Sequence, residues 1–167
     1  MVLIGLPGSG KSAAGRSVAA LLATECEDLD DAIAAAAGRP IPTIFAQSGE
    51  PAFRDLERAA MSRALARPPH VIVAGGGWAA QPGNLEAAAS DALIIHLSCS
   101  PETAVARLAD GPERPLLAVD RVAAMRRLHA ERATFYARAD AAVSTEGRDV
   151  EAVAREVARL ARSLGTW

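Results

Sequence analysis

The chain has 167 residues, of which 50% are hydrophobic and 23% are charged, and its formal net charge at pH 7 is −2. This length suits one compact domain with a sizeable core and excludes two large domains. The charge lacks the basic excess of nucleic-acid-binding proteins, so we expect no nucleic-acid partner.

Two cysteines, Cys26 and Cys99, are too few for a disulfide framework and lack the spacing of metal ligands. Residues 1–5 carry no basic residue, and no apolar run reaches the roughly 18 residues that a membrane helix needs. We therefore expect a cytoplasmic protein without signal peptide or membrane contact, and we expect it to be a monomer.

Short apolar runs alternate with helical patterns along the whole chain. Strands are predicted at 1–4, 24–28, 71–74, 92–97 and 140–144. Helices are predicted at 11–23, 31–37, 50–66, 82–89, 101–109, 120–138 and 149–164. Continuous apolar strands joined by helices are typical of a parallel sheet covered on both faces. The pattern predicts a three-layer α/β fold with a five-stranded parallel sheet, in one domain over residues 1–167.

The strongest motif is Gly5-Leu6-Pro7-Gly8-Ser9-Gly10-Lys11-Ser12, which fills the P-loop pattern GxxxxGK[ST] between a predicted strand and a predicted helix. Backbone N–H groups of such a loop surround phosphate oxygens, the lysine reaches the β- and γ-phosphates, and the Ser12 hydroxyl is a ligand for Mg²⁺. Lys11 is the only lysine among 18 basic residues, which indicates a site that needs a compact ammonium. The alternative is a glycine-rich turn that only connects strand to helix. ATP contacts are expected at Gly8, Ser9, Gly10, Lys11, Ser12 and Ala13.

Acidic residues follow the second predicted strand, beside the P-loop. Asp28 and Asp30 point the same way if the chain stays extended, so one can face a metal while the other meets an acceptor hydroxyl. The alternative is a capping role, with Asp30 or Asp31 as the N-cap of a helix that ends at Gly38.

Two further segments are candidates for binding an acceptor. Arg54 lies early in the helix predicted at 50–66, where a solvated or salt-bridged arginine is the alternative. Gly75, Gly76 and Gly77 follow the third strand and permit close approach of the backbone to a ligand, although a structural turn explains them as well.

Prolines and glycine interrupt the helical pattern at residues 110–119, which predicts an exposed loop or lid that carries Arg114. An arginine on such a loop can reach a transferring phosphoryl group. Arg132 lies on the long helix that follows. Solvent-exposed arginines are the alternative at both positions.

The P-loop and the segments DLD, FR, GGG, RPLL and RxxxY occur in the order and approximate spacing of shikimate kinases. The resemblance runs from Met1 to about Arg148, and it includes the stretches GRPI at 38–41 and IF at 44–45. It implies a P-loop kinase with a lid that transfers the γ-phosphoryl group of ATP to the 3-hydroxyl of shikimate, in aromatic amino acid biosynthesis. Mg²⁺ is the implied cofactor.

The resemblance also implies roles for single residues. It implies a substrate-binding segment at about 30–60. On the shikimate side it implies Asp30 at the 3-hydroxyl, Arg54 and Arg132 at the carboxylate, and Gly75, Gly76 and Gly77 at the ring. On the nucleotide side it implies Ser12 and Asp28 at the magnesium, Arg107 over the adenine, Arg148 in the adenine loop and Arg114 at the phosphoryl group. The catalytic residues would be Lys11, Asp30 and Arg114.

The sequence departs from the family pattern at Trp78, where a small residue is usual, and this departure concerns the wall of the acceptor pocket. Two other functions stay open. A gluconate-type or other small-metabolite P-loop kinase also binds a carboxylate and hydroxyls, but it is expected to lack the GGG and RPLL segments. A non-catalytic nucleotide-binding module is expected to lack the arginine and aspartate set.

Arg114 gives the first prediction. Arg114→Ala is expected to lower kcat far more than it raises the KM for shikimate, because the contact strengthens in the transition state. Arg114→Lys recovers only part of the loss, since one ammonium cannot replace the guanidinium fork. Steady-state kinetics on both variants measure this, and an unchanged kcat in Arg114→Ala removes the lid from the mechanism.

Overall fold

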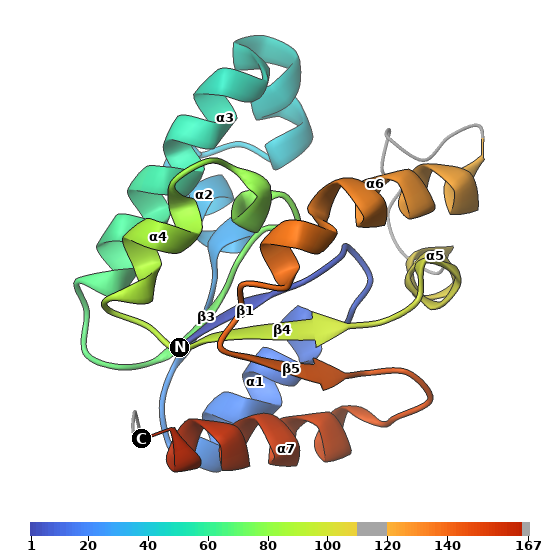
Figure 1. Ribbon diagram of the computed structural model, residues 1–167. Coiled ribbons are helices and arrows are strands. Elements are labelled where there is room, and N and C mark those ends of the chain that lie inside the picture. The colour runs from blue at the N-terminus through green and yellow to red at the C-terminus, as the bar shows by residue number, and fades with distance from the viewer. Residues whose placement is uncertain (110–119, 165–167) are drawn as a thin grey trace.

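The computed structural model describes residues 1–109 and 120–164. Five parallel strands form one sheet in the order β2-β3-β1-β4-β5 (Figure 1). The strands are β1 (Val2–Ile4), β2 (Cys26–Asp28), β3 (Val71–Val73), β4 (Ile94–Ser98) and β5 (Ala141–Ser144). The predicted five-stranded parallel sheet is confirmed.

The helices surround this sheet and alternate with its strands. They are α1 (Lys11–Leu22), α2 (Leu29–Ala37), α3 (Ile41–Leu65), α4 (Asn84–Ala89), α5 (Pro101–Ala109), α6 (Arg121–Tyr136) and α7 (Val150–Ser163), with a 3₁₀ turn η1 (Trp78–Ala80). Each predicted helix has its counterpart, and the bounds agree within a few residues except at the start of α3. The 3₁₀ turn was not predicted.

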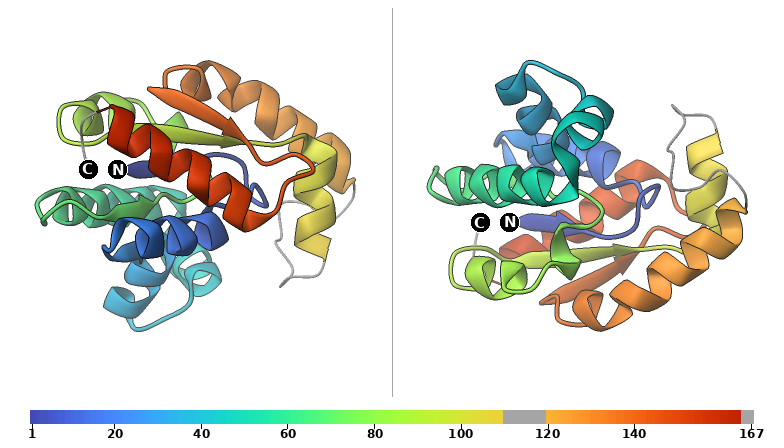
Figure 2. Two further views of the ribbon diagram at one scale, coloured as in Figure 1. Left: turned by 90° about the horizontal axis from the view of Figure 1, so that it is seen from below. Right: turned by 90° about the horizontal axis from the view of Figure 1, so that it is seen from above.

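Both faces of the sheet are buried, which explains why its central strands are apolar at successive positions. Leu3 and Val73 face the side that α1 and α7 cover. Ile4 and Ile72 face the opposite side, in a cluster that includes residues of α3, α4 and α6. Figure 2 shows the two helical layers from below and from above. The predicted three-layer α/β architecture is therefore confirmed.

Helix α3 begins earlier than the sequence predicted. Its first part, residues 41–48, is helical, and Gly49 then breaks the helix with φ 76° and ψ 172° before the chain continues through Pro51. The prediction of a helix only from residue 50 was wrong, because Pro42, Gly49 and Pro51 do not prevent the first part of this stretch from being helical. Pro42 in fact occupies the first turn, where proline loses no hydrogen bond.

The alternative role of Asp30 or Asp31, as the N-cap of α2, does not occur either. The N-cap is Asp28, whose Oδ1 accepts a hydrogen bond of 3.1 Å from the Asp30 N–H. Because the helix begins directly after β2, Asp30 is helical and does not continue the strand, so the extended arrangement of the two aspartates does not occur. The helix does end at Gly38, in the left-handed conformation.

Parallel pairing brings the carboxyl ends of all five strands to one edge of the sheet. The P-loop follows β1, Asp28 ends β2, the three glycines follow β3, and Thr145 follows β5. The segment predicted as a lid, with Arg114, lies outside the described residues. Among residues 1–109 and 120–164, no helix is long and apolar enough to cross a membrane.

Gly15 in α1 gives a prediction about the packing of this helix on the sheet. A Cβ at this position would lie 2.6 Å from Cγ2 of Val73 and 3.1 Å from Sγ of Cys26. Gly15→Ala is therefore expected to lower the free energy of unfolding by roughly 1 to 3 kcal/mol, because overpacking outweighs the gain in helix propensity of about 1 kcal/mol.

Urea unfolding followed by circular dichroism measures this change. The double variant Gly15→Ala/Val73→Ala provides the control, because removal of the valine methyl groups frees the space that the new Cβ needs. Its loss of stability should be smaller than the two single losses added together. A Gly15→Ala protein more stable than the parent would contradict the close packing.

Candidate active site

The P-loop, residues 5–12, presents the amino end of α1. Gly10 is the N-cap of α1 in the left-handed conformation, and no side chain caps the helix. The first-turn N–H groups of α1 therefore have no side-chain cap, and uncapped N–H groups at the amino end of a helix can bind an anion. Lys11 Nζ donates to the carbonyl oxygens of Gly5 and Leu6, at 3.0 and 2.9 Å. Ser9 is fully buried, and its Oγ has no hydrogen-bond partner among the described residues.

Ser12 and Asp28 lie together beside this loop. Ser12 Oγ donates a hydrogen bond of 2.6 Å to Asp28 Oδ2, while the other oxygen of the same carboxylate caps α2. A hydroxyl and a carboxylate are oxygen ligands of the kind that Mg²⁺ prefers when substrate phosphates complete its shell. No cluster of three or more His, Cys, Asp or Glu side chains that could hold a metal occurs among the described residues. The pair thus fits a magnesium shared with phosphates.

A small cavity of about 160 Å³ lies next to the P-loop. It is lined by Pro7, Asp30, Ile41, Phe45, Phe53, Arg54, Glu57, Gly75, Gly76, Gly77, Met125, Leu128 and Arg132. The structure therefore brings together all the residues predicted to bind the acceptor. Apolar side chains supply part of the wall and charged groups converge from α2, α3 and α6, an arrangement suited to a small polar ring with an anionic group.

The three glycines are needed because four different side chains approach them closely. At Gly75, a Cβ would lie 2.6 Å from Glu57 Oε1 and 2.9 Å from Asp30 Oδ1. At Gly77 it would lie 3.0 Å from both terminal nitrogens of Arg54. At Gly76 it would lie 2.9 Å from Cγ of Pro7 in the P-loop. The backbone at the end of β3 thus lies close to the charged groups of this cavity and to the P-loop at once.

Arg54 and Glu57 form an ion pair in the interior of this site. Their side chains are only 16% and 2% exposed, and the distance between Arg54 Nη1 and Glu57 Oε2 is 2.5 Å. Burial raises the pKa of Glu57 and the charge of Asp30 adds to this, whereas Arg54 opposes it. Burial also works against the charge of Arg54, but the hydrogen bonds to Glu57 and Glu50 raise its pKa. Arg54 is thus cationic and oriented toward the cavity.

Arg132 reaches the site from α6. Its Nη1 donates a hydrogen bond of 2.6 Å to the carbonyl oxygen of Gly76, and the Tyr136 hydroxyl donates to the same oxygen at 3.3 Å. Tyr136 is buried and stacks on His96, with ring centroids 4.5 Å apart. Burial, helped by the charges of His129 and Lys11, lowers the pKa of His96 to about 4, so this ring is neutral at physiological pH.

A second cavity, of about 500 Å³, lies on the other side of the P-loop. Ser9, Gly10, Arg107, Thr145 and Arg148 are among the residues that line it. Arg148 donates to Glu156 Oε2 at 2.6 Å and to the carbonyl oxygens of Ser144 and Ala152. The residues predicted for the adenine therefore border one cavity that continues from the phosphate loop.

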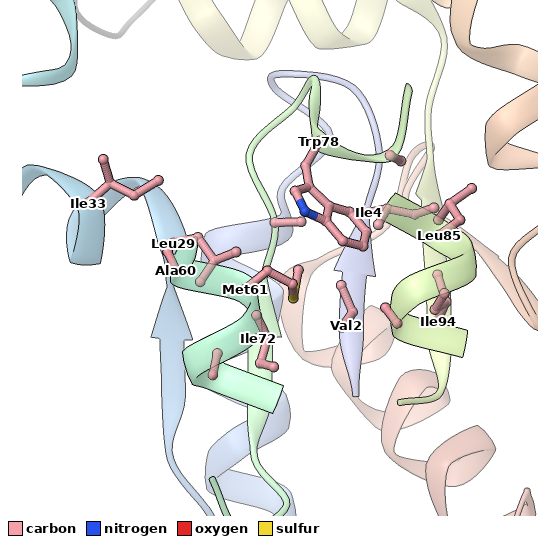
Figure 3. Packing of buried hydrophobic residues seen from close by; sticks show 14 of the residues in the cluster. Val2, Ile4, Leu29, Ile33, Ala60, Met61, Ile72, Trp78, Leu85 and Ile94 are labelled. Carbon is pink, nitrogen blue, oxygen red and sulfur yellow. The ribbon is translucent and has the colours of Figure 1, made fainter. Parts of the chain in front are cut away.

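Trp78 points into the core and does not line the acceptor cavity. It is 1% exposed and packs among Ile4, Met61 and Leu85 (Figure 3). This departure from the family pattern therefore does not form part of the wall of that cavity. Trp78 instead borders a larger cavity of about 560 Å³ between α3 and α4, which contains none of the predicted site residues.

The sequence analysis did not single out Glu57, which the fold places in the core as the partner of Arg54. The sequence did carry a signal. In α3 the buried residues Phe53, Ala60, Met61 and Ala64 form an apolar stripe, and Glu57 occupies a position within it. A carboxylate on such a stripe needs a buried partner, and Arg54 one turn earlier is that partner.

Comparison with known proteins agrees with this geometry. The shikimate kinase family model matches residues 7–162. Shikimate kinase of Salinispora tropica is 44% identical over 160 residues, 95% of each chain. The solved structure of shikimate kinase from Acinetobacter baumannii in complex with shikimate superposes with a TM-score of 0.92 at 29% identity, and the match covers 99% of this chain and 94% of that one.

A gluconokinase from Sinorhizobium meliloti 1021 is also similar, with a TM-score of 0.61 at 19% identity over 98% of this chain and 93% of that one. At this identity the likeness concerns the fold alone, so it does not favour the gluconate-type alternative. The family match and the identity to the relative both extend over nearly all of the sequence. The chain belongs to the shikimate kinase family.

Proposed function

We propose that this protein transfers the γ-phosphoryl group of ATP to the 3-hydroxyl of shikimate, which yields shikimate 3-phosphate and ADP. The observation that carries the proposal is that Pro7 of the P-loop lines the same small cavity as Asp30, Arg54 and Arg132. An acceptor bound in this cavity would lie directly beside the phosphate chain. Proximity and orientation account for much of the rate of such a reaction.

Shikimate carries one carboxylate and three hydroxyls, and the cavity offers a partner for each kind of group. Arg54 and Arg132 bind the carboxylate through charge-assisted hydrogen bonds. Asp30 Oδ1 accepts the proton of the 3-hydroxyl as the oxygen attacks. The backbone of Gly76 and Gly77 lies against the ring. Residues of the segment at about 30–60 thus supply one wall of the acceptor site.

On the nucleotide side, Gly8, Ser9, Gly10, Ser12 and Ala13 bind the phosphate oxygens through the loop and the amino end of α1. Lys11 lies across the β- and γ-phosphates and stabilises the charge that spreads over the transferring group. Arg107 and Arg148 border the cavity for the adenine. Arg114, on the segment predicted as a lid, supplies a further cation.

Ser12 and Asp28 would hold the Mg²⁺ that accompanies ATP. When bound, this ion neutralises charge on the phosphate oxygens. The hydrogen bond between these two side chains sets their oxygens side by side before any ligand binds.

A cytoplasmic location and a monomeric state stay predictions. Cys26 and Cys99 are both free and half-buried, in agreement with a reducing compartment. Gel filtration with light scattering measures the mass in solution directly.

Coupled measurement of ADP release with shikimate, quinate and gluconate tests the proposed function. We expect strong release with shikimate and only background release with gluconate. In Lys11→Ala the shikimate-dependent rate should fall by about 100-fold or more, because a cation that stabilises γ-phosphate charge is lost. Arg16→Ala, an exposed cation on the same helix, is the matched control and should keep the rate.

Two outcomes would overturn the proposal. ADP release with gluconate and none with shikimate would indicate the alternative sugar-acid kinase. Tight ATP binding without any acceptor-dependent release would indicate a nucleotide-binding module that is not an enzyme.

The two acceptor arginines give a separate prediction. Arg54→Ala and Arg132→Ala are each expected to weaken shikimate binding by roughly 2 to 4 kcal/mol, because each removes a charge-assisted hydrogen bond from a largely desolvated anion. Arg58→Ala is the matched control, since Arg58 lies on the same helix, is 53% exposed and pairs only with Asp55 among the described residues. Titration calorimetry provides the affinities. If both arginine variants bind shikimate like the parent protein, the carboxylate site lies elsewhere.

A further inference from the structure

We propose that Thr145, directly after β5, is a positioning residue for ATP: it orients the guanidinium of Arg107 at the cavity that receives the adenine. This inference rests on the proposed ATP site and extends it to a residue that acts on the base through Arg107. Two sets of contacts carry it, one between Thr145 and Arg107 and one between the same turn and α5.

Arg107 is attached to Thr145 by two hydrogen bonds. Its Nη1 donates to Thr145 Oγ1 at 3.0 Å, and its Nη2 donates to the Thr145 carbonyl oxygen at 2.7 Å. Two bonds from one planar guanidinium to one residue fix its orientation as well as its position. The fixed group lies close to the P-loop, because Nη1 is 3.9 Å from the place of a Cβ on Gly10.

Thr145 is itself fixed by the sheet. Its N–H donates to the carbonyl oxygen of Ser98 at 2.8 Å, and its hydroxyl donates to the same oxygen at 3.2 Å. The residue is only 4% exposed. Since the hydroxyl proton goes to Ser98, the oxygen lone pairs are directed to Arg107, and the side chain connects β4 to the guanidinium.

The residue after Thr145 fixes the start of α5, which carries Arg107. The Glu146 carboxylate accepts a hydrogen bond of 2.9 Å from the Ser100 N–H and another from the Thr103 hydroxyl. The turn at 145–146 therefore holds α5 at its amino end and at Arg107. An arginine held at both points presents a preformed surface to a purine base, and cation–π stacking on such a surface is favourable.

Thr145→Val keeps the shape of the side chain and removes the hydroxyl, whereas Thr145→Ser keeps the hydroxyl. Titration calorimetry with ATP and with inorganic tripolyphosphate, both with excess Mg²⁺, separates the base from the phosphates. We expect Thr145→Val to weaken ATP binding by about tenfold, because binding must now order a mobile arginine. Tripolyphosphate, which has no base, should bind as in the parent protein, and Thr145→Ser should bind ATP nearly normally.

In steady-state kinetics the same Thr145→Val change should raise the KM for ATP and leave kcat and the KM for shikimate near the parent values. Thr24→Val is the matched control, because it also removes a threonine hydroxyl, but one that donates to the carbonyl oxygen of Pro69 and contacts neither Arg107 nor α5. It should bind both ligands normally.

Two results would overturn the inference. One is parent-like affinity for ATP in Thr145→Val, and the other is an equal loss of affinity for ATP and for tripolyphosphate in that variant, since equal losses mean general damage to the P-loop. A parent protein that binds tripolyphosphate as tightly as ATP would instead refute the adenine cavity of the proposed function.

Discussion

The close approach of four side chains to the glycine triplet after β3 is the constraint on which the rest of the site depends. The carboxylates of Asp30 and Glu57, the ring of Pro7 and the guanidinium of Arg54 each occupy the space that a side chain would take at residues 75–77. Parallel strand order brings these groups to one edge of the sheet, but only a backbone without Cβ atoms lets them converge. The cavity proposed for the acceptor and the P-loop are neighbours because of this turn.

The buried pair Arg54–Glu57 explains how a cation is kept in a largely desolvated cavity. An isolated guanidinium there would carry a large desolvation cost, and a buried partner offsets it. Glu57 binds Arg54 from the core side, while Glu50, which is 62% exposed, binds it from the solvent side at 2.8 Å. A substrate carboxylate can compete with the solvated Glu50 more readily than with Glu57, so Arg54 keeps its orientation when an anion binds.

The sequence predicted the strands other than β2 because each is a short apolar run with clear breaks, whereas β2, with the sequence Cys-Glu-Asp, gave only a weak signal. It also predicted the P-loop and the residues that gather around it. It could not predict which aspartate caps α2, since Asp28, Asp30 and Asp31 have equal propensity for that role and only the position of the strand end decides.

The role of Glu57 and the burial of Trp78 depended on three-dimensional packing. Glu57 lies on an apolar stripe of α3, and its burial could be interpreted only once the structure showed that Arg54 pairs with it. The residues next to Trp78 in the sequence do not determine to which side of the backbone its indole ring points. In the structure the ring lies in the core between α3 and α4.

Shikimate affinity of Gly75→Ala tests the central claim most directly. The new methyl group meets only the ends of two side chains, so the protein should fold, but Asp30 and Glu57 must move away. Titration calorimetry is expected to show shikimate binding weakened by about tenfold or more, with ADP affinity unchanged, since the charged groups lose their placement. Parent-like affinity for shikimate in this variant would contradict the account.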